Sequence, residues 1–231
     1  MLMAKTQKQK VTVVIPAFNE EKTIGSVIDG VRPFCDETLV VLSKRSSDAT
    51  GKIAKAKKVK VIVDNGLGKG EGLRCAISEI PDGVIVFIDA DGSHIPEHIP
   101  LLVEPIALGR ADMVIASRFL GGSEELHGDL DKFLRMFFSQ CIAFAVNLRF
   151  GAEIQDTQNG FRAISAKAAK SLNLSSRHTE IETEMTMKCF KKGLRVLEVP
   201  SLERKRKFGE SSISLSRHGL AYAWQVLRNL I

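Results

Sequence analysis

Two aspartates separated by one residue, Asp89 and Asp91, end an apolar run in the segment VFIDADGSH (86–94). Alternate side chains of an extended chain point to the same side, so both carboxylates face one way. Two carboxylates this close repel each other unless a cation or a proton lies between them. Hard oxygen ligands in an open site suit Mg²⁺ or Mn²⁺ held jointly with the phosphates of a substrate. The alternative is a turn or helix-capping pair, because a helical stretch follows.

Two further segments could contact phosphate. GLGKGEG (66–72) precedes a helical stretch, so its backbone N–H groups could approach a phosphate or nucleotide, although it has the spacing of neither a P-loop nor a dinucleotide fingerprint. A tight turn with a solvated Lys69 explains it equally well. Arg135 and Ser139 are four residues apart in a helical pattern and share a face, where they could clamp a phosphate or be ordinary surface residues.

The elements that must position these residues follow from five short apolar runs rich in β-branched residues. The runs are VTVVI (11–15), TLVVL (38–42), VKVIV (59–63), VIVFI (84–88) and DMVIA (112–116), with helical stretches at 20–31, 48–57, 69–79 and 96–108 between them. Runs that are apolar on consecutive positions are typical of strands buried on both faces of a parallel sheet. The alternation predicts a doubly wound α/β sheet, whose ligand crevice lies beyond the carboxyl ends of the strands.

The second half of the chain has a different pattern. Apolar residues at helical spacing predict a long amphipathic helix that packs on the core or dips into an interface; they are Leu130, Phe133, Leu134, Phe137, Cys141, Phe144, Ala145 and Leu148. A turn-rich segment at 156–162, a helix near 180–191 and a strand near 194–199 follow. A C-terminal helix near 213–231 carries Leu220, Trp224, Leu227 and Ile231 on one face, which suits either packing on its own domain or membrane contact.

Composition describes an ordinary globular protein: 231 residues, 44% hydrophobic and 26% charged, with a formal net charge of +6. A basic run at 204–207 is either a solvated face or a surface for phosphates or an anionic membrane. One Tyr, one Trp and the lack of a binding motif argue against nucleic acid. Four scattered cysteines predict reduced thiols, and the sequence shows neither a signal peptide nor a spanning segment.

Taken in order, the motifs resemble the family 2 glycosyltransferases with the GT-A fold, and within them the dolichol-phosphate (polyprenol-phosphate) mannose synthases. The resemblance covers almost the whole chain after residue 10. It rests on VVIPAFNEEKTI (13–24), SSDATGKIA (46–54), GKGEGLRCAI (68–77), FIDADGSHIPEHIPLL (87–102), ADMVIASRFLGG (111–122), Arg135 with Ser139, DTQNGFRAI (156–164), ETEM (182–185), EVP (198–200) and GESSISLSRHG (209–219).

The resemblance implies an α/β GT-A fold with a mostly parallel central sheet flanked by helices. We expect residues 1–10 to form a flexible basic tail and 11–231 a single glycosyltransferase domain. Within that domain, 11–116 would be the nucleotide-sugar-binding half. Residues 117–231 would be the acceptor-binding half, with a basic amphipathic C-terminal helix.

The resemblance also implies a role for individual residues. Asp89 and Asp91 would hold Mg²⁺ or Mn²⁺ against the donor diphosphate, and Asp156 would face the sugar and acceptor. The expected donor-binding residues are Pro16, Phe18, Glu20, Asp48, Lys69, Asp89, Ser93 and Arg118, with Pro16, Phe18 and Glu20 lining the base and ribose. The expected acceptor-phosphate ligands are Arg135, Ser139 and Arg206.

Two positions depart from the family pattern. Ser93 stands where the family usually has Gln, which affects the outer support of the metal. Ser43 and Lys44 stand where an acidic pair usually follows the second strand. Lys44 can only donate hydrogen bonds, so either the nucleoside is recognised differently or Lys44 and Arg45 turn into solvent.

We therefore expect a metal-dependent inverting glycosyltransferase that moves a sugar from a GDP-mannose or UDP-hexose type of donor to a polyprenol phosphate. It would be peripheral on the cytoplasmic face of a membrane, with a membrane protein as a possible partner. Such an acceptor is already an anion and needs no strong base, whereas a hydroxyl acceptor would need one, with Asp156 as the first candidate. The alternatives are an enzyme with a soluble phosphorylated acceptor and a non-catalytic nucleotide-sugar-binding module.

Overall fold

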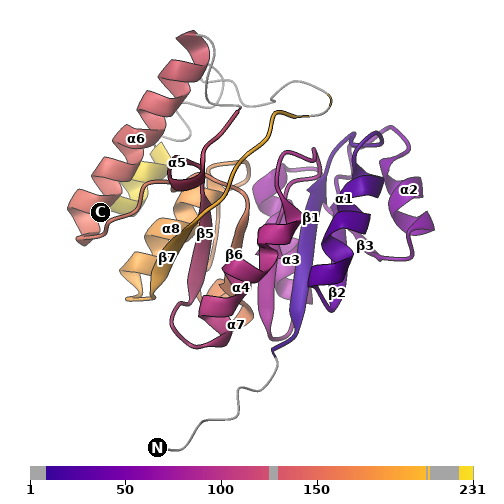
Figure 1. Cartoon of the computed structure of the whole chain (residues 1–231), viewed down its shortest axis with the longest axis horizontal. Helices are drawn as coiled ribbons and strands as arrows, with labels where there is room; N and C mark the ends of the chain where they lie inside the picture. Colours follow the sequence, from indigo (N-terminus) through magenta and orange to yellow (C-terminus); the bar gives the residue numbers. More distant parts are fainter. Residues whose placement is uncertain (1–8, 125–129, 207, 209–223, 231) are drawn as a thin grey trace, which may run out of the picture.

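A seven-stranded sheet runs through the molecule, with the strand order β3-β2-β1-β4-β6-β5-β7. The computed structural model describes residues 9–124, 130–206, 208 and 224–230 (Figure 1). The strands are β1 (Val11–Ala17), β2 (Glu37–Leu42), β3 (Lys60–Val63), β4 (Val84–Phe87), β5 (Met113–Ser117), β6 (Arg162–Ser165) and β7 (Val196–Pro200).

All neighbouring strands pair in parallel except at β6, which is antiparallel to both β4 and β5. The predicted mostly parallel α/β sheet is therefore confirmed. Strand β6 was not predicted, because it begins at Arg162 inside the turn-rich segment 156–162 and has only two apolar residues. Its insertion between β4 and β5 joins the strands β1 to β4 to β5 and β7 in one sheet.

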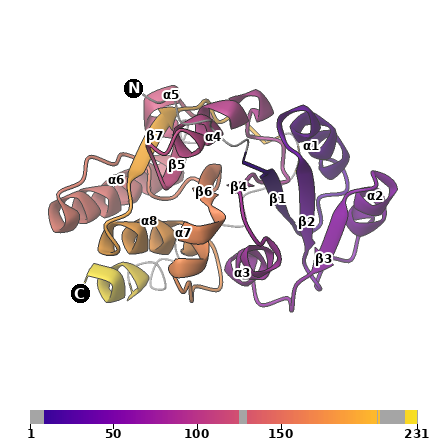
Figure 2. The ribbon, with the colours of Figure 1, turned by 90° about the horizontal axis from the view of Figure 1, so that it is seen from below.

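Helices cover both faces of this sheet. The helices are α1 (Ile24–Val31), α2 (Thr50–Ala56), α3 (Lys69–Glu79), α4 (Ile99–Ala107), α5 (Arg118–Gly121), α6 (Leu130–Phe150), α7 (Ala166–Ser171) and α8 (Ile181–Lys191), with 3₁₀ turns η1 (Arg32–Phe34) and η2 (Pro96–His98). Helices α1, α2 and α4 pack on one face, and α3, α7 and α8 on the other (Figure 2). Two layers of helices around a central sheet are what the alternating pattern predicted.

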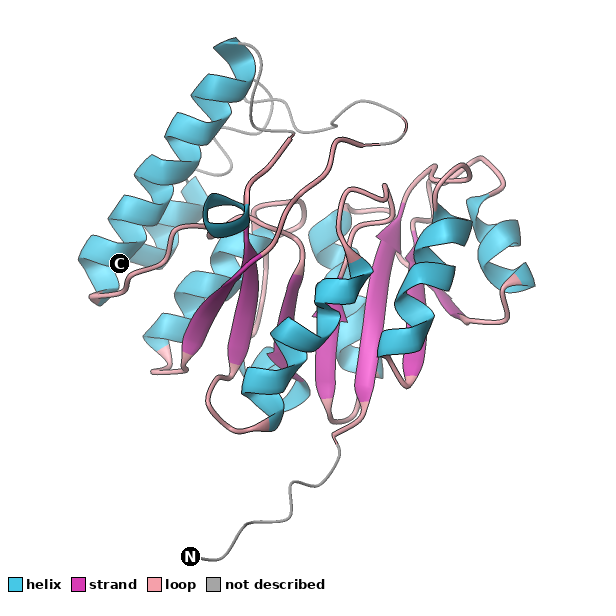
Figure 3. Cartoon of the chain, in the orientation of Figure 1, coloured by secondary structure: helices cyan, strands magenta, loops and turns pink. Residues whose placement is uncertain are grey.

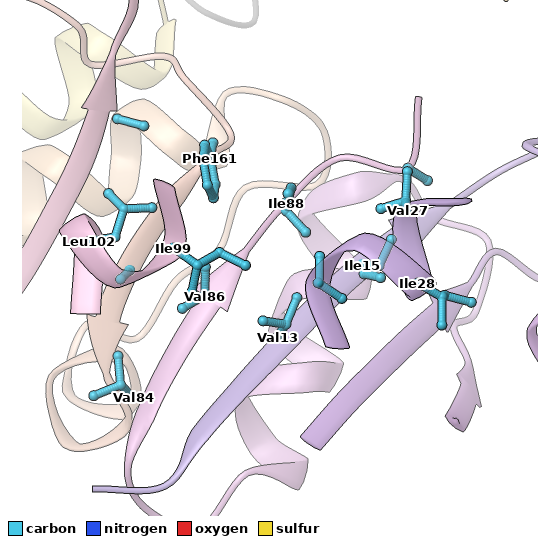
Figure 4. Close-up of a cluster of buried hydrophobic side chains, with 14 of the residues drawn as sticks. Val13, Ile15, Val27, Ile28, Val84, Val86, Ile88, Ile99, Leu102 and Phe161 are labelled. Atoms are coloured by element: carbon cyan, nitrogen blue, oxygen red, sulfur yellow. The ribbon is translucent and has the colours of Figure 1, made fainter. Parts of the chain in front are cut away.

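The core lies between the sheet and these two layers. Val13 and Ile15 of β1 belong to one cluster with residues of α1 and α4 (Figure 4). Val14 between them belongs to the other cluster, with residues of α3 and α8. Successive strand residues point to opposite faces, so a strand covered on both sides needs apolar residues at consecutive positions. Phe161 adds a fully buried ring to the first cluster, close to the carboxyl end of β4.

The long helix α6 corrects the expectation that its phenylalanine stripe packs on the core. Phe144 is 69% exposed and Leu148 77% exposed, and Phe133 and Phe137 are exposed as well. The buried side of α6 is the opposite one, with Ser139, Ala143 and Val146. A stripe of large apolar residues therefore faces away from the rest of the described chain. The expectation that it lies in an interface stays a prediction.

The end of the described chain is a short helix over residues 224–230. Its Trp224 and Leu227 are exposed, and Val226 instead packs with Val146 of α6 and Met187 of α8. The predicted partners on its apolar face, Leu220 and Ile231, lie outside the described residues. Within the described ranges, no helix is both long and apolar enough to cross a bilayer.

Candidate active site

A pocket of ≈ 680 Å³ opens beyond the carboxyl ends of β1, β2, β3 and β4, at the sheet edge where the loops gather in Figure 3. Many of the residues that the sequence predicted for the site line it: Pro16, Phe18, Glu20, Asp48, Lys69, Asp89, Asp91 and Arg206. The others are not among its lining residues: Ser93, Arg118, Arg135, Ser139 and Asp156. The parallel strands explain the gathering, because each one delivers its following loop to the same edge.

Asp89 is held by two cationic or potentially cationic side chains. Its Oδ1 lies 2.6 Å from Nζ of Lys69, and its Oδ2 lies 3.4 Å from Nε2 of His94. Burial alone would raise the pKa of Asp89, but the Lys69 ammonium and His94 hold it well below the usual value of an aspartate. Asp89 is therefore a permanent anion at neutral pH, which suits either a metal ion or a hydrogen-bond donor in the pocket.

Asp91 is fixed by Ser93 and Arg206. Its Oδ1 accepts hydrogen bonds from the backbone N–H of Ser93 at 3.0 Å and from its hydroxyl at 2.7 Å. Its Oδ2 lies 3.3 Å from Nε of Arg206. Ser93 does not line the pocket, so its contribution is to orient the aspartate from behind.

Arg206 is brought to Asp91 by the segment that follows β7. The backbone N–H of Arg204 donates to the carbonyl of Ser93 at 2.8 Å, and Ser123 forms a bridge with Glu203. Part of the basic run thus belongs to the pocket rather than to a solvated face. Lys207, the last residue of that run, lies outside the described residues.

Lys69 links Asp89 to a second acid that the sequence did not assign a role. Its Nζ lies 2.8 Å from Oε1 of Glu182, which is 2% exposed and comes from α8. Burial would lower the pKa of Lys69, but Asp89 and Glu182 together raise it. The other oxygen of Glu182, Oε2, has no hydrogen-bond partner among the described residues. A Cβ at Gly160 would come 2.9 Å from Asp89 Oδ2 and Lys69 Nζ, so a side chain there would displace part of this cluster.

The glycine-rich segment 66–72 differs from both interpretations of its sequence. The backbone N–H groups of Gly70 and Glu71 donate to the carbonyl of Arg177, at 2.8 and 3.3 Å, and so are not directed at the pocket. A Cβ at Gly70 would lie 2.6 Å from the carbonyl oxygen of Ser176, which explains the glycine by close backbone packing. Lys69 is ion-paired in the pocket rather than solvated.

The loops after β1 and β2 are tied together at the mouth of the pocket. Asn19 has a left-handed backbone with φ 55°, and its side-chain oxygen accepts from the N–H of Ser47 at 2.9 Å. Asp48 accepts from the N–H of Glu21 at 3.0 Å and from the hydroxyl of Thr50 at 2.6 Å. These bonds hold Phe18, which is 53% exposed, in the wall of the pocket.

Asp156 and Arg118 form an ion pair beside the pocket, although the sequence suggested that Arg118 would bind the donor and that Asp156 would face the sugar and acceptor. Asp156 is completely buried and accepts from Nε of Arg118 at 2.7 Å and from its NH2 at 2.9 Å. It also accepts from the backbone N–H groups of Gln158 and Asn159, at 3.1 and 3.0 Å. Burial would raise the pKa of Asp156, but Arg118 and these bonds lower it. This geometry does not favour Asp156 as a general base; its carboxylate positions Arg118.

Arg135 and Ser139 lie on α6, on the side opposite its exposed phenylalanines. Ser139 is 4% exposed, and its hydroxyl has no hydrogen-bond partner among the described residues. Arg135 is half-buried. The predicted shared face of Arg135 and Ser139 is thus the inner side of α6.

The carboxylates of Asp89 and Asp91 fit a divalent cation only as a partial ligand set. Both supply hard oxygen atoms at the pocket, where Lys69 and Arg206 compensate their charge. In the described part of the chain, no group of three or more His, Cys, Asp or Glu side chains could hold a metal ion. A cation here would complete its coordination with oxygens of a ligand, as Mg²⁺ does with substrate phosphates.

Comparison with known proteins identifies the family and the fold. The family model described as glycosyl transferase family 2 matches residues 12–172. The chain belongs to glycosyltransferase family 2. An uncharacterized protein of Methanocaldococcus jannaschii is 36% identical over 200 residues, which are 84% of this chain and 81% of that protein. An undecaprenyl-phosphate mannosyltransferase of Micrococcus luteus is 29% identical over 243 residues, covering 95% of this chain and 98% of that protein.

The fold is also similar to that of a glycosyltransferase of known structure. The glucosyl-3-phosphoglycerate synthase of Mycobacterium tuberculosis, in complex with Mn²⁺, UDP and glucosyl-3-phosphoglycerate, superimposes with a TM-score of 0.73. It is 26% identical, and the match covers 96% of this chain and 79% of that one. The predicted GT-A fold, the family 2 glycosyltransferase class and the resemblance to the polyprenol-phosphate mannose synthases are confirmed.

Within this glycosyltransferase fold, the two cations after β2 have separate positions. Arg45 lines the pocket and its side chain lies over Gly66, where a Cβ would come 2.9 Å from Arg45 Cγ. Lys44 is not among the lining residues. Of these two cations, only Arg45 is therefore placed where it could contact a nucleoside in the pocket.

Sequence reasoning assigned no individual role to Asp64, which lines the pocket, or to Glu182, which contacts Lys69 from outside the lining. Glu182 belongs to the matched segment ETEM of α8, and that match was the available signal. Asp64 follows β3 directly, which was the same signal that located Asp89 after β4.

Proposed function

We propose that this glycosyltransferase moves a sugar from a nucleoside diphosphate sugar to a polyprenol phosphate at a membrane surface. The observation that carries the lipid acceptor is the two-sided helix α6. One side presents exposed Phe133, Phe137 and Phe144, and the other carries Arg135 with the unpartnered hydroxyl of Ser139. An apolar face and a phosphate-binding pair on one helix match the two ends of a lipid phosphate.

The donor would lie across the pocket with its diphosphate at Asp89 and Asp91. A Mg²⁺ or Mn²⁺ ion bound by these carboxylates would neutralise the charge of the departing diphosphate. Arg206 would move from Asp91 to the diphosphate oxygens, because a phosphate offers its guanidinium the same bidentate pairing as a carboxylate. Support for a metal comes from the similar synthase, whose structure was solved in complex with Mn²⁺ and UDP.

The transferred sugar would contact the cluster of Lys69, Asp89 and Glu182. The unpartnered Oε2 of Glu182 can accept a hydrogen bond from a sugar hydroxyl, and Lys69 can donate one. Gly160 has no side chain that would displace Asp89 or Lys69 from this cluster. Buried polar groups that stay unpaired without the ligand favour a substrate that pairs them.

The transfer needs no strong base from the protein. A phosphate oxygen of the acceptor, already ionised at neutral pH, would attack the anomeric carbon. The bond from that carbon to the diphosphate would break with its electron pair on the leaving nucleoside diphosphate, and the anomeric configuration would invert. The lowered pKa of Asp156 agrees with a reaction in which this residue accepts no proton.

We further propose that the enzyme is peripheral on the cytoplasmic face of the membrane, with the phenylalanine side of α6 in the interface and a membrane protein as a possible partner. Aromatic and aliphatic side chains on one side of a helix bury in the headgroup region of a bilayer. Trp224 and Leu227 add further exposed apolar side chains near the end of the described chain.

A small phosphorylated acceptor is the second candidate. The similar solved synthase is named for a glucosylated phosphoglycerate, a soluble phosphate. Arg135 and Ser139 would suit its phosphate as well as that of a lipid. The exposed side of α6 favours the lipid, because a soluble acceptor has no use for it.

Transfer assays with labelled nucleoside diphosphate sugars separate the two acceptors. The protein is incubated with Mn²⁺ and either polyprenol phosphate in anionic vesicles or 3-phosphoglycerate, and the label is partitioned between organic solvent and water. We expect label in the organic phase with polyprenol phosphate. Label that enters only a water-soluble product would reject the lipid acceptor, and the absence of any transfer or donor hydrolysis would reject both.

A matched pair of surface variants tests the membrane face. Phe144→Ser should reduce cosedimentation with anionic vesicles and lipid-dependent transfer, because Phe144 is 69% exposed on the proposed face. Leu108→Ser is the control, since Leu108 is 50% exposed at the end of α4, on a different part of the surface. Equal vesicle binding by both variants and the wild type would contradict the proposed face.

A further inference from the structure

Asp64 lies at the end of the pocket farthest from the proposed diphosphate site. It follows β3, and the sheet order β3-β2-β1-β4 places it three strand spacings from the residues that follow β4, or ~14 Å across the sheet. Both ends belong to the same pocket, whose wall between them includes Pro16, Phe18 and Val41. A ligand bound at both ends is elongated, with its aromatic part beside Phe18.

One oxygen of Asp64 is committed to the backbone and the other is not. Oδ1 accepts from the N–H of Lys44 at 2.9 Å and from the N–H of Gly66 at 2.7 Å. No described residue donates a hydrogen bond to Oδ2. The residue as a whole is only 6% exposed, and an unused acceptor position on a mostly buried carboxylate favours a ligand that donates to it.

The surroundings of Oδ2 keep it open toward the pocket. A Cβ at Gly72 would come 3.2 Å from Oδ2 and 3.2 Å from Val41 Cγ1, so the lack of a side chain at Gly72 leaves this space clear. The neighbouring buried acid, Glu71, is engaged elsewhere, because it accepts from the backbone and side-chain nitrogens of Asn65 at 3.1 and 2.8 Å. Asp64 is therefore the carboxylate available at this end.

We propose that Asp64 determines which nucleobase the enzyme accepts, by receiving on Oδ2 the ring N–H that uracil and guanine carry and adenine and cytosine lack. Arg45, which lines the same end of the pocket, donates to the carbonyl oxygen next to that N–H. This inference rests on the proposed nucleoside diphosphate sugar as donor. Asp64, in the loop after β3, would then recognise the base, and the backbone N–H of Lys44 in the loop after β2 holds its carboxylate in place.

The anchoring of Oδ1 makes the asparagine variant unusually informative. In Asp64→Asn the amide oxygen must take the Oδ1 position to accept from Lys44 and Gly66, since the amide nitrogen can only donate. The amide nitrogen then occupies the Oδ2 position and places a donor opposite the N–H of the base. The substitution reverses the polarity of this one contact and retains the shape of the loop.

The test measures the affinity of UDP, GDP, CDP and ADP for the full chain with Mn²⁺ by titration calorimetry. We expect UDP or GDP to bind the wild type most tightly. The affinity of that nucleotide should fall at least about tenfold in Asp64→Asn, because a hydrogen bond to a charged group is replaced by two donors that face each other. Asp82→Asn, an exposed position away from the pocket, should leave all four affinities unchanged.

Methylated nucleotides identify the contact without relying on the variant. N3-methyluridine diphosphate or N1-methylguanosine diphosphate lacks the ring N–H and should bind the wild type at least about tenfold more weakly than its parent. In Asp64→Asn the same methyl group should change affinity by less than about threefold, because the acceptor is gone.

Three results would overturn the inference alone: tightest binding of ADP or CDP, an unchanged ranking in Asp64→Asn, or equal binding of the parent and methylated nucleotides by the wild type. Failure of all four nucleotides to bind would overturn the proposed donor class as well as the role of Asp64.

Discussion

The pocket beyond β1–β4 and the helix α6 differ in how their side chains are held. In the pocket, charged residues far apart in sequence bind one another, as Lys69 does with Asp89 and Glu182. On α6 the large apolar side chains, such as Phe144, face outward, and the small Ala143 and Val146 face inward. The end of a predicted parallel strand therefore predicts where the polar residues that follow it will lie. An apolar stripe on a helix predicts two different faces, but not which of them packs against the rest of the protein.

The largest expected effect comes from the polar region. Asp91→Asn removes the charge that Arg206 and the proposed metal ion share, and should lower the rate of sugar transfer about 10³-fold, the loss typical for one electrostatic group at a developing charge. Initial rates at saturating donor measure the change. Asp82→Asn, at an exposed position, is the control and should retain the wild-type rate. A loss of about tenfold or less in Asp91→Asn would show that Asp91 is not central to the reaction.

Arg118→Met tests whether the pair beside the pocket is structural. It leaves the completely buried carboxylate of Asp156 without its cation, and should lower the free energy of unfolding at pH 7 by about 3–5 kcal/mol. Because Arg118 lowers the pKa of Asp156, the pair stabilises the fold above the ordinary aspartate pKa of about 4, and this contribution is lost as pH falls through the lower folded-state pKa. The deficit of the variant should therefore shrink below about pH 4.

Chemical denaturation of Arg118→Met and the wild type at several pH values measures this pattern. A deficit that stays constant down to acid pH would mean that lost packing, rather than the uncompensated charge, destabilises the variant.

Two substitutions on α6 sharpen the contrast between its faces. Val146→Ala should lower the free energy of unfolding by about 2 kcal/mol, since Val146 is completely buried against Met187 and Val226. Phe144→Ala removes a larger side chain but should change the free energy of unfolding by less than about 0.5 kcal/mol, because that ring is exposed. Urea denaturation of both variants gives the comparison, and the reverse order would place the phenylalanine stripe in the core after all.

The smallest expected effect concerns the cations after β2. Arg45→Ala should weaken binding of the preferred nucleoside diphosphate about threefold, since an exposed guanidinium contributes little. Lys44→Ala should leave the affinity unchanged, because Lys44 does not line the pocket. Calorimetric titration distinguishes the two. A larger loss for Lys44→Ala would show that its side chain turns toward the ligand.

Much of the fold was readable from local pattern. The helix over 69–79 has the predicted bounds, and the five early strands lie within a residue of their predicted ends, apart from β1, which runs on to Ala17. Helix α2 begins at Thr50 rather than at 48 because Asp48 accepts hydrogen bonds from Thr50 and so precedes the first turn. Strand β6 was missed because it begins inside the turn-rich segment and has only two apolar residues, Ala163 and Ile164, whereas the equally short β3 and β4 are mostly or wholly apolar.

The sequence by itself determined that polar residues collect beyond one edge of a parallel sheet, because β-branched runs specify buried strands and each strand carries its next residues to that edge. Only the tertiary structure decided how those residues pair. Glu182 meets Lys69 from a distant part of the chain, Asp156 serves Arg118 instead of the pocket, and Asp64 keeps one oxygen for a ligand. Such pairings depend on which distant elements pack together, and composition and periodicity carry no information about distance in space.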